Sequence, residues 1–181
     1  MANWEVILLD TNTPEHLETL HISEIVITPE HAKRKESKEF RESKKRLKAD
    51  GHYHCYICGT TENLQAHHFG AEWSLSAIVD FAKLKLFCLE WDVYGYSRLL
   101  KNTPITSCDD VRNFMILCEE HHTSNNSTAK NPTGIHHLTF PIFIIQKLAK
   151  DGLDPVPQEG QTIEAVEDAI KVYQAVAVNE Q

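Results

Sequence analysis

The chain has 181 residues, of which 41% are apolar and 24% charged, the composition of an ordinary globular protein. No apolar run reaches the roughly 18 residues that cross a bilayer, and the first residues, MANWEVILLDTNT, lack the basic start and cleavage site of a signal peptide. We therefore expect a cytoplasmic protein with no membrane partner, in which the five cysteines are metal ligands or free thiols rather than disulfides.

The net charge of −8 argues against a nucleic-acid partner, but the charge is unevenly distributed. Residues 31–50 hold nine of the 18 Lys and Arg residues and only four of the 26 Asp and Glu residues. One short segment is therefore strongly basic in an otherwise acidic chain, and this asymmetry is more informative than the net charge.

The basic segment is predicted to be helical. Residues 1–30, which precede it, are treated as an N-terminal extension without assignable chemistry. Residues 31–48 contain no Gly or Pro, and at about 100° per residue their basic side chains form one stripe. The stripe consists of Arg34, Lys38, Arg41, Lys45 and Lys48, while Phe40 and Leu47 fall together away from it, so the helix can dock through these two apolar residues. It would suit a nucleic-acid backbone, and the alternative is a solvated surface helix with Glu–Lys pairs.

Further along the chain, the sequence predicts one hairpin and several helical segments, and hence an α+β fold. The hairpin covers residues 51–69. The helical segments are 74–91 with Ser74 as a cap, a short turn within 104–113 begun by Ser107, 141–152 closed by Gly152, and an amphipathic helix over 162–178.

Two pairs of possible metal ligands stand far apart in the sequence. Cys55 and Cys58 form C-x2-C inside the predicted hairpin, and Cys118 and His121 form C-x2-H at a predicted helix start. Two such pairs can close a tetrahedral zinc site, and a second pair at a helix start is typical of a treble-clef zinc knuckle. We therefore predict one structural Zn²⁺ ion, which stabilises the fold.

A further set of polar residues surrounds these knuckles: His67, His68, Asn113 and His122. The order C-x2-C, His-His, Asn, then Leu-Cys-x2-His-His resembles the HNH endonuclease family, the ββα-metal nucleases, in the form that is braced by a four-ligand zinc. The resemblance covers residues 51–69 and 109–127.

This resemblance implies a small ββα-metal core and cleavage of phosphodiester bonds in nucleic acid, with DNA expected on family grounds. It implies that His68 is the general base and that Asn113 holds the loop of that base in place. It also implies a catalytic divalent ion, Mg²⁺, Mn²⁺ or another metal, bound by His67, His122 and Asn126.

Elementary chemistry agrees with these roles. Histidine has an ordinary pKa of about 6.5 and can accept a proton near neutral pH. Neighbouring residues on a helix point about 100° apart, so His121 can face the zinc while His122 faces the catalytic ion. His122 and Asn126 are four residues apart and can share that ion.

Several alternatives remain open. Neighbouring residues on a strand point to opposite faces, so His67 and His68 can serve one site only at a strand end or an irregular turn. The pair could instead supply one zinc ligand and one surface residue. Asn126 could simply end its helix. His136 and His137 are either close to the site or ordinary packing residues.

The distance along the chain between His68 and Asn113 exceeds what a compact hairpin needs, so residues 70–108 are predicted to form a helical insertion. Its apolar part, 74–100, is expected to pack on the domain or to contact a second subunit or protein partner. The nuclease domain would then cover residues 31–158, followed by a C-terminal amphipathic helix over 159–181.

Two other functions compete with the nuclease. One is a non-catalytic treble-clef zinc module that binds nucleic acid or protein through the same knuckles and basic helix. The other is a protein-binding scaffold that retains the nuclease fold. The joint presence of His68, Asn113 and His122 favours the nuclease, because folding around zinc requires none of them.

Overall fold

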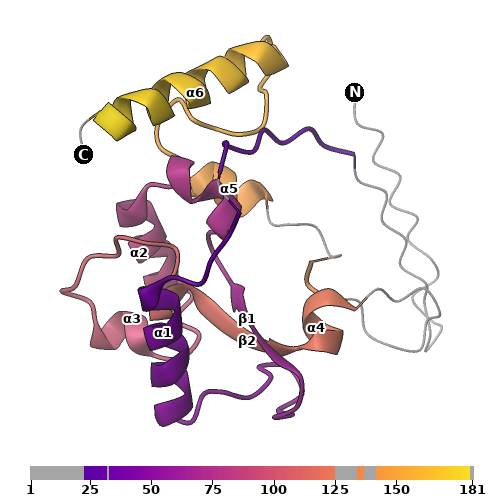
Figure 1. Cartoon of the computed structure of the whole chain (residues 1–181), viewed down its shortest axis with the longest axis vertical. Coiled ribbons are helices and arrows are strands. Elements are labelled where there is room, and N and C mark those ends of the chain that lie inside the picture. The colour runs from indigo at the N-terminus through magenta and orange to yellow at the C-terminus, as the bar shows by residue number, and fades with distance from the viewer. Residues whose placement is uncertain (1–22, 32, 125–133, 137–141, 180–181) are drawn as a thin grey trace, which may run out of the picture.

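The computed structural model describes residues 23–31, 33–124, 134–136 and 142–179, and its fold is mixed α+β. Two strands, β1 (Leu64–His68) and β2 (Phe114–Cys118), form an antiparallel sheet. Figure 1 shows this sheet in the middle of the molecule, with α4 (Glu119–Thr123) directly after β2.

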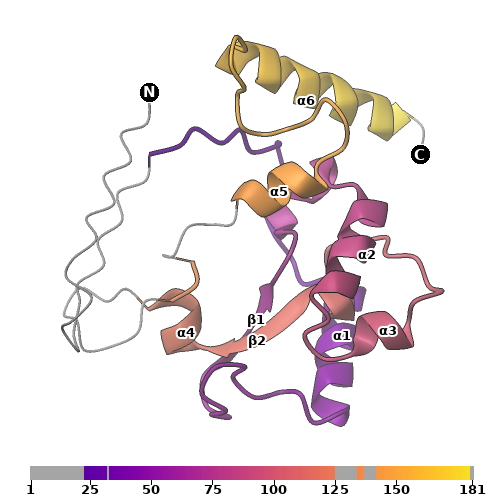
Figure 2. The ribbon, with the colours of Figure 1, turned by 180° about the vertical axis from the view of Figure 1, so that it is seen from behind.

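Helices surround the sheet. In chain order they are α1 (Lys38–Ala49), the 3₁₀ helix η1 (Trp73–Ile78), α2 (Phe81–Glu90), α3 (Tyr96–Leu99), the 3₁₀ turn η2 (Val111–Asn113), α4, α5 (Ile142–Leu148) and α6 (Ile163–Asn179). Figures 1 and 2 show α6 at one end of the molecule and α1 at the other. Within the described ranges, no helix has both the length and the apolarity that a membrane span needs.

The basic helix α1 begins at Lys38, later than the sequence predicted. Ser37 caps it, because the Ser37 hydroxyl accepts a hydrogen bond from the Phe40 amide at 2.9 Å. Arg34 therefore precedes the helix and does not belong to a helical stripe. The apolar docking residues behave as predicted, since Phe40 and Leu47 are buried against one face of the sheet.

Four other predicted elements differ from the structure. The helix predicted over 141–152 ends at Leu148 as α5, before Gly152. No strand is described within residues 51–63, and β1 pairs with β2 across the insertion instead of closing a hairpin over 51–69. The predicted helix 74–91 is divided into η1 and α2, because the Asp80 carboxylate caps a new helix by accepting from the Ala82 amide. The short turn η2 is likewise capped by Asp110 rather than by Ser107.

The insertion between the strands packs on this chain's own helices. A single buried cluster joins η1, α2, α5 and α6, and its most buried members include Ile78, Leu84, Leu148 and Ile170. The insertion and the C-terminal helices thus bury one another, as expected for a segment that is too apolar to stay in solvent.

The two faces of the sheet belong to different clusters. Phe114 and Ile116 of β2 face α1 and α3, whereas Met115 and Leu117 face the other way, towards Cys55. Side chains alternate along a strand, so neighbouring residues of β1 also point to opposite faces of the sheet. This alternation separates the two adjacent histidines at the end of β1.

The docking of α6 gives a direct test of the fold. Ile170 is buried at 2% exposure, whereas Val172, two residues later, is 64% exposed. We expect Ile170→Ala to lower the free energy of unfolding by about 2–5 kcal/mol, and Val172→Ala to change it by less than about 0.5 kcal/mol. Urea unfolding followed by circular dichroism measures both, and equal effects would contradict the observed packing.

Candidate metal centre

The four predicted zinc ligands come from two separate turns. In the first, the Cys55 amide donates to the Thr60 carbonyl and the Gly59 amide donates to the Cys55 carbonyl, each at 2.8 Å. Gly59 has a φ of +74°, a conformation that favours glycine. In the second turn, β2 ends at Cys118, the N-cap of α4, so that His121 lies in the first turn of that helix.

These turns bring the four ligand atoms within 4.8 Å of one another. The Cys58 and Cys118 sulfurs are 3.9 Å apart, and the Cys55 sulfur lies 3.6 Å from Nδ1 of His121. Tetrahedral zinc with Zn–S bonds of about 2.3 Å would place two sulfurs roughly 3.8 Å apart. The cluster of Cys55, Cys58, Cys118 and His121 could therefore hold a metal ion such as zinc.

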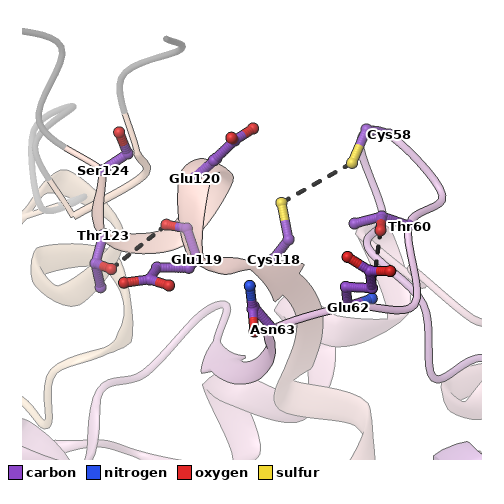
Figure 3. A pocket seen from close by; sticks show the side chains of 9 residues that line it. All are labelled: Cys58, Thr60, Glu62, Asn63, Cys118, Glu119, Glu120, Thr123 and Ser124. Atoms are coloured by element: carbon purple, nitrogen blue, oxygen red, sulfur yellow. Dashed lines mark hydrogen bonds between the residues drawn. The ribbon is translucent and has the colours of Figure 1, made fainter.

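An open pocket of about 460 Å³ lies beside this cluster (Figure 3). The Cys58 and Cys118 sulfurs point towards one another at its rim, and three exposed glutamates line it: Glu62, Glu119 and Glu120. A phosphate backbone would be repelled here. A nucleic-acid ligand would therefore have to approach the protein from another side.

A second cluster consists of three histidines: His67 at the end of β1, His122 on α4, and His136. Their ligand atoms also lie within 4.8 Å of one another, and Nε2 of His136 is 2.8 Å from Nε2 of His122. The other ring nitrogen of His122 is hydrogen-bonded to Gln65 of β1. A partner on that nitrogen fixes the ring and leaves Nε2 facing the cluster.

His136 reaches this cluster because its backbone caps α4. The last carbonyls of a helix have no partner within the helix. Here the Ile135 amide donates to the His121 carbonyl at 2.9 Å, and the His136 amide donates to the His122 carbonyl at 3.1 Å. Gly134 makes this approach possible, because a Cβ there would lie 2.7 Å from the His122 backbone.

The chemistry of the three-histidine cluster suits a metal ion. Burial lowers the pKa of both His67 and His122 to about 4, so both rings are neutral at physiological pH, the form in which imidazole binds metals. Nδ1 of His67 is buried and has no hydrogen-bond partner within the described part of the chain. The cluster opens to solvent at His136, which is exposed.

His68 belongs to a different network on the other face of the sheet. Its Nε2 is 2.8 Å from the Asp109 carboxylate, and its ring packs between Phe40 and Phe114. Burial lowers the pKa of His68, but the hydrogen bond with Asp109 and the nearby Glu72 carboxylate raise it by more, to above its ordinary value. The side chain is 1% exposed, so His68 is an enclosed, carboxylate-paired imidazole.

Glu72 lies between the two histidine networks. One of its carboxylate oxygens is 3.6 Å from Nδ1 of His67, and the other is 3.7 Å from Nδ1 of His68. Burial raises the pKa of Glu72, but the interaction with His68 lowers it by more, so the carboxylate stays ionised. Glu72 is thus a half-buried negative charge that both adjacent histidines face.

Asn113 ties the loop after β1 to the segment before β2. Its carbonyl oxygen accepts from the Gly70 and Ala71 amides at 2.8 and 3.1 Å, and its amide donates to the carbonyls of Ala71 and Cys108. The side chain is fully buried and makes all four of these bonds. It therefore fixes where the chain leaves β1, directly after His68.

No protein-family model matches the chain, and no match is found among curated proteins or solved structures. The arrangement of the site therefore stands on its own geometry. The structure gathers the four predicted zinc ligands, and it brings His67 together with His122. It places His68 in a separate network, while Asn126 lies outside the described residues.

Glu72 and Asp109 were not singled out from the sequence, and His136 was left open between a place close to the site and ordinary packing. His136 stands in the motif TGIHH, where the preceding glycine was the only local signal of a close backbone approach. Asp109 carries no local signal, because it reaches His68 only through the tertiary fold, whereas Glu72 stands just four residues after His68 in the sequence.

The four-ligand cluster predicts a tightly held metal. We expect about one zinc ion per folded chain, lost together with the fold in Cys118→Ser, because binding at a structural site contributes folding free energy of order 10 kcal/mol. Cys88→Ala is the matched control, since Cys88 is also buried but lies outside the cluster. Elemental analysis measures the zinc content of the parent and of both variants, and circular dichroism measures their folding. Folded parent protein without zinc would refute the prediction.

Proposed function

We propose that this protein is a metal-dependent endonuclease of the HNH type, which hydrolyses phosphodiester bonds in nucleic acid, with DNA as the expected substrate. The observation that carries the proposal is the cluster of His67, His122 and His136, where two buried neutral imidazoles meet a third that is open to solvent. The order β1, β2, α4, with a possible zinc site at the β2–α4 junction, also agrees with a ββα-metal core.

The three histidines would bind the catalytic divalent ion, with His136 in addition to the two ligands expected from the sequence. Bound there, such an ion would neutralise negative charge that develops on the phosphate and the leaving oxygen. Gln65 would orient His122 from behind, as a hydrogen-bond acceptor on the outer nitrogen of a metal-binding histidine commonly does.

His68 is proposed as the proton acceptor. If Asp109 accepts from Nε2–H of His68, the Nδ1 atom is left without a proton and can take one. That nitrogen faces Glu72, which also faces His67. Asp109 would then stabilise the positive charge that His68 acquires, and Asn113 would hold the loop that fixes the ring.

The nucleic acid would be bound by the exposed basic residues of α1. Lys38, Arg41, Lys45 and Lys48 are all exposed, and so is Arg34 just before the helix. Asp109 links this helix to the site, because it accepts from the Ser37 hydroxyl at 2.7 Å while pairing with His68. The acidic pocket of Figure 3 would repel phosphates, whereas these exposed basic residues would attract them.

A non-catalytic zinc module is the second candidate, and one observation favours it. The His68 side chain is only 1% exposed and already paired with Asp109, so it could serve simply as a buried brace between α1 and β1. Such a module would bind nucleic acid with the same salt dependence, but it would not cleave nucleic acid in the presence of any divalent metal.

Cleavage decides between the two. We expect the protein to nick supercoiled plasmid DNA with Mg²⁺ or Mn²⁺, and we expect His68→Ala to lose at least ~100-fold in rate, the usual contribution of a general base. His136→Ala should lose activity and weaken Mn²⁺ binding measured by calorimetry, while both variants keep their zinc.

His54→Ala serves as the control for that experiment, because His54 belongs to neither histidine network. Full activity in His68→Ala would assign the proton acceptor elsewhere. Absence of cleavage by the parent with every divalent metal, despite binding of DNA, would favour the non-catalytic module.

The basic helix predicts a salt dependence. Each phosphate contact contributes about 0.9 to the negative slope of log affinity against log salt concentration on duplex DNA. Replacing Arg41 and Lys45 by Gln should therefore reduce the slope by about 2 and weaken binding to all sequences alike. The double variant of Lys83 and Lys147 changes the net charge equally, and both of these lysines are already paired with carboxylates. An equal loss from this control would mean that net charge, and not the helix, governs binding.

A further inference from the structure

An aromatic hollow of about 260 Å³ opens on the surface near the three-histidine cluster. It is lined by Tyr56, Phe69, Trp91, Asp92, Val93 and Met115. Two of the aromatic residues that line it are unusually exposed for their size, since Tyr56 is 50% exposed and Trp91 is 60% exposed. Large aromatic side chains left in solvent at one concave place commonly mark a binding site.

The aromatic walls are held in place from behind. Trp91 caps α2, where its amide donates to the Phe87 carbonyl at 2.9 Å, and its ring stacks on the Phe87 ring at 6.5 Å and 24°. Phe69 contacts both of these rings. The Tyr56 amide donates to the Ile116 carbonyl of β2 at 2.8 Å. The hollow therefore exists before any ligand binds, so that binding would cost little conformational entropy.

The hollow and the three-histidine cluster share one face of the sheet. Met115, which lines the hollow, is the register partner of His67, and directly opposed residues of an antiparallel pair lie side by side on one face. Phe69 and Met115 also pack with Ile135, the residue before His136. A nucleic-acid strand whose phosphate backbone reached the three histidines could therefore place a neighbouring base in the hollow.

The chemistry of the hollow suits a nucleobase. Three aromatic rings offer flat faces for stacking, and every base has a π-face that can use them. The only carboxylate in the lining, Asp92, is 3% exposed and accepts hydrogen bonds from the Ser97 and Arg98 amides, so little bare negative charge faces a phosphate-bearing ligand.

We propose that this hollow binds one unpaired nucleobase of the strand whose backbone lies at the three-histidine cluster. The inference rests on the proposed nuclease function and adds a substrate preference to it. A base that enters the hollow must leave its own duplex stack, so the protein should favour single-stranded or locally unpaired nucleic acid over perfect duplex.

Binding is measured by fluorescence anisotropy on the zinc-loaded protein without added Mg²⁺ or Mn²⁺, so that the fold is kept while no cleavage occurs. The probes are labelled oligothymidylate, the same strand with several abasic positions, and a perfect duplex. We expect the parent to bind the intact single strand more tightly than the abasic strand. Trp91→Ala should weaken binding to the intact single strand by roughly 5- to 150-fold, the range reported for loss of one stacked base, with a much smaller effect on duplex.

Trp91→Phe, which keeps an aromatic face, should restore most of the affinity. Leu86→Ala is the matched control, because Leu86 is an equally exposed apolar residue of α2 at 62% that does not line the hollow. Because Trp91→Ala removes a ring packed on Phe87, its thermal melting temperature and zinc content are checked, and Tyr56→Ala supplies a second variant from the other wall.

The outcomes separate the two proposals. Equal affinity of the parent for intact and abasic strands, or unchanged binding in both Trp91→Ala and Tyr56→Ala, would refute the base-binding hollow while leaving the nuclease proposal standing. A parent that binds neither single-stranded nor duplex DNA would overturn both. Equal loss in Leu86→Ala would show that general apolar surface, rather than stacking, is responsible.

Discussion

The structure depends on the alternation of side chains along one short antiparallel pair. His67 and His68 are neighbours at the end of β1, and their register partners, Met115 and Phe114, belong to opposite faces of the sheet. One histidine therefore joins the imidazoles of α4, and the other joins the carboxylate beneath α1. A shift of one residue in the register would exchange the two histidines and break both networks.

Much of this could be read from the sequence where the determinants are local. The two knuckles could be predicted because the two-residue spacing within each pair lets both side chains reach one metal ion from a tight turn. The apolar positions Phe40 and Leu47 of the basic helix were predicted from helical periodicity. The start of that helix was predicted wrongly. The helix begins only after Ser37, because the Ser37 side chain caps it and also bonds Asp109, although good helix formers precede it.

Several parts that could not be predicted depend on distant contacts. Asp109 is 41 residues from His68 along the chain, and nothing in its own surroundings in the sequence marks it as a partner of that ring. At the break in the apolar helix, the cap on α2 comes from Asp80 itself, but the neighbouring Val79 pairs with Ala149, far along the chain. His136 joins the site only because the chain returns to cap α4, a backbone role that its residue type does not reveal.

Glu72 shows how the two faces are nevertheless coupled. Alternation directs His67 and His68 apart, but both rings have Nδ1 within 4 Å of this one carboxylate, which follows the loop that Asn113 holds. An ionised carboxylate with 17% exposure is expensive to bury unless positive charge or hydrogen-bond donors compensate it. One of its oxygens and Nδ1 of His67 have no hydrogen-bond partner among the described residues, so the compensation on the His67 side is incomplete. A cation bound to His67 would supply the missing positive charge, and this electrostatic demand, rather than the resemblance to any family, is the physical reason to expect a metal at the three-histidine cluster.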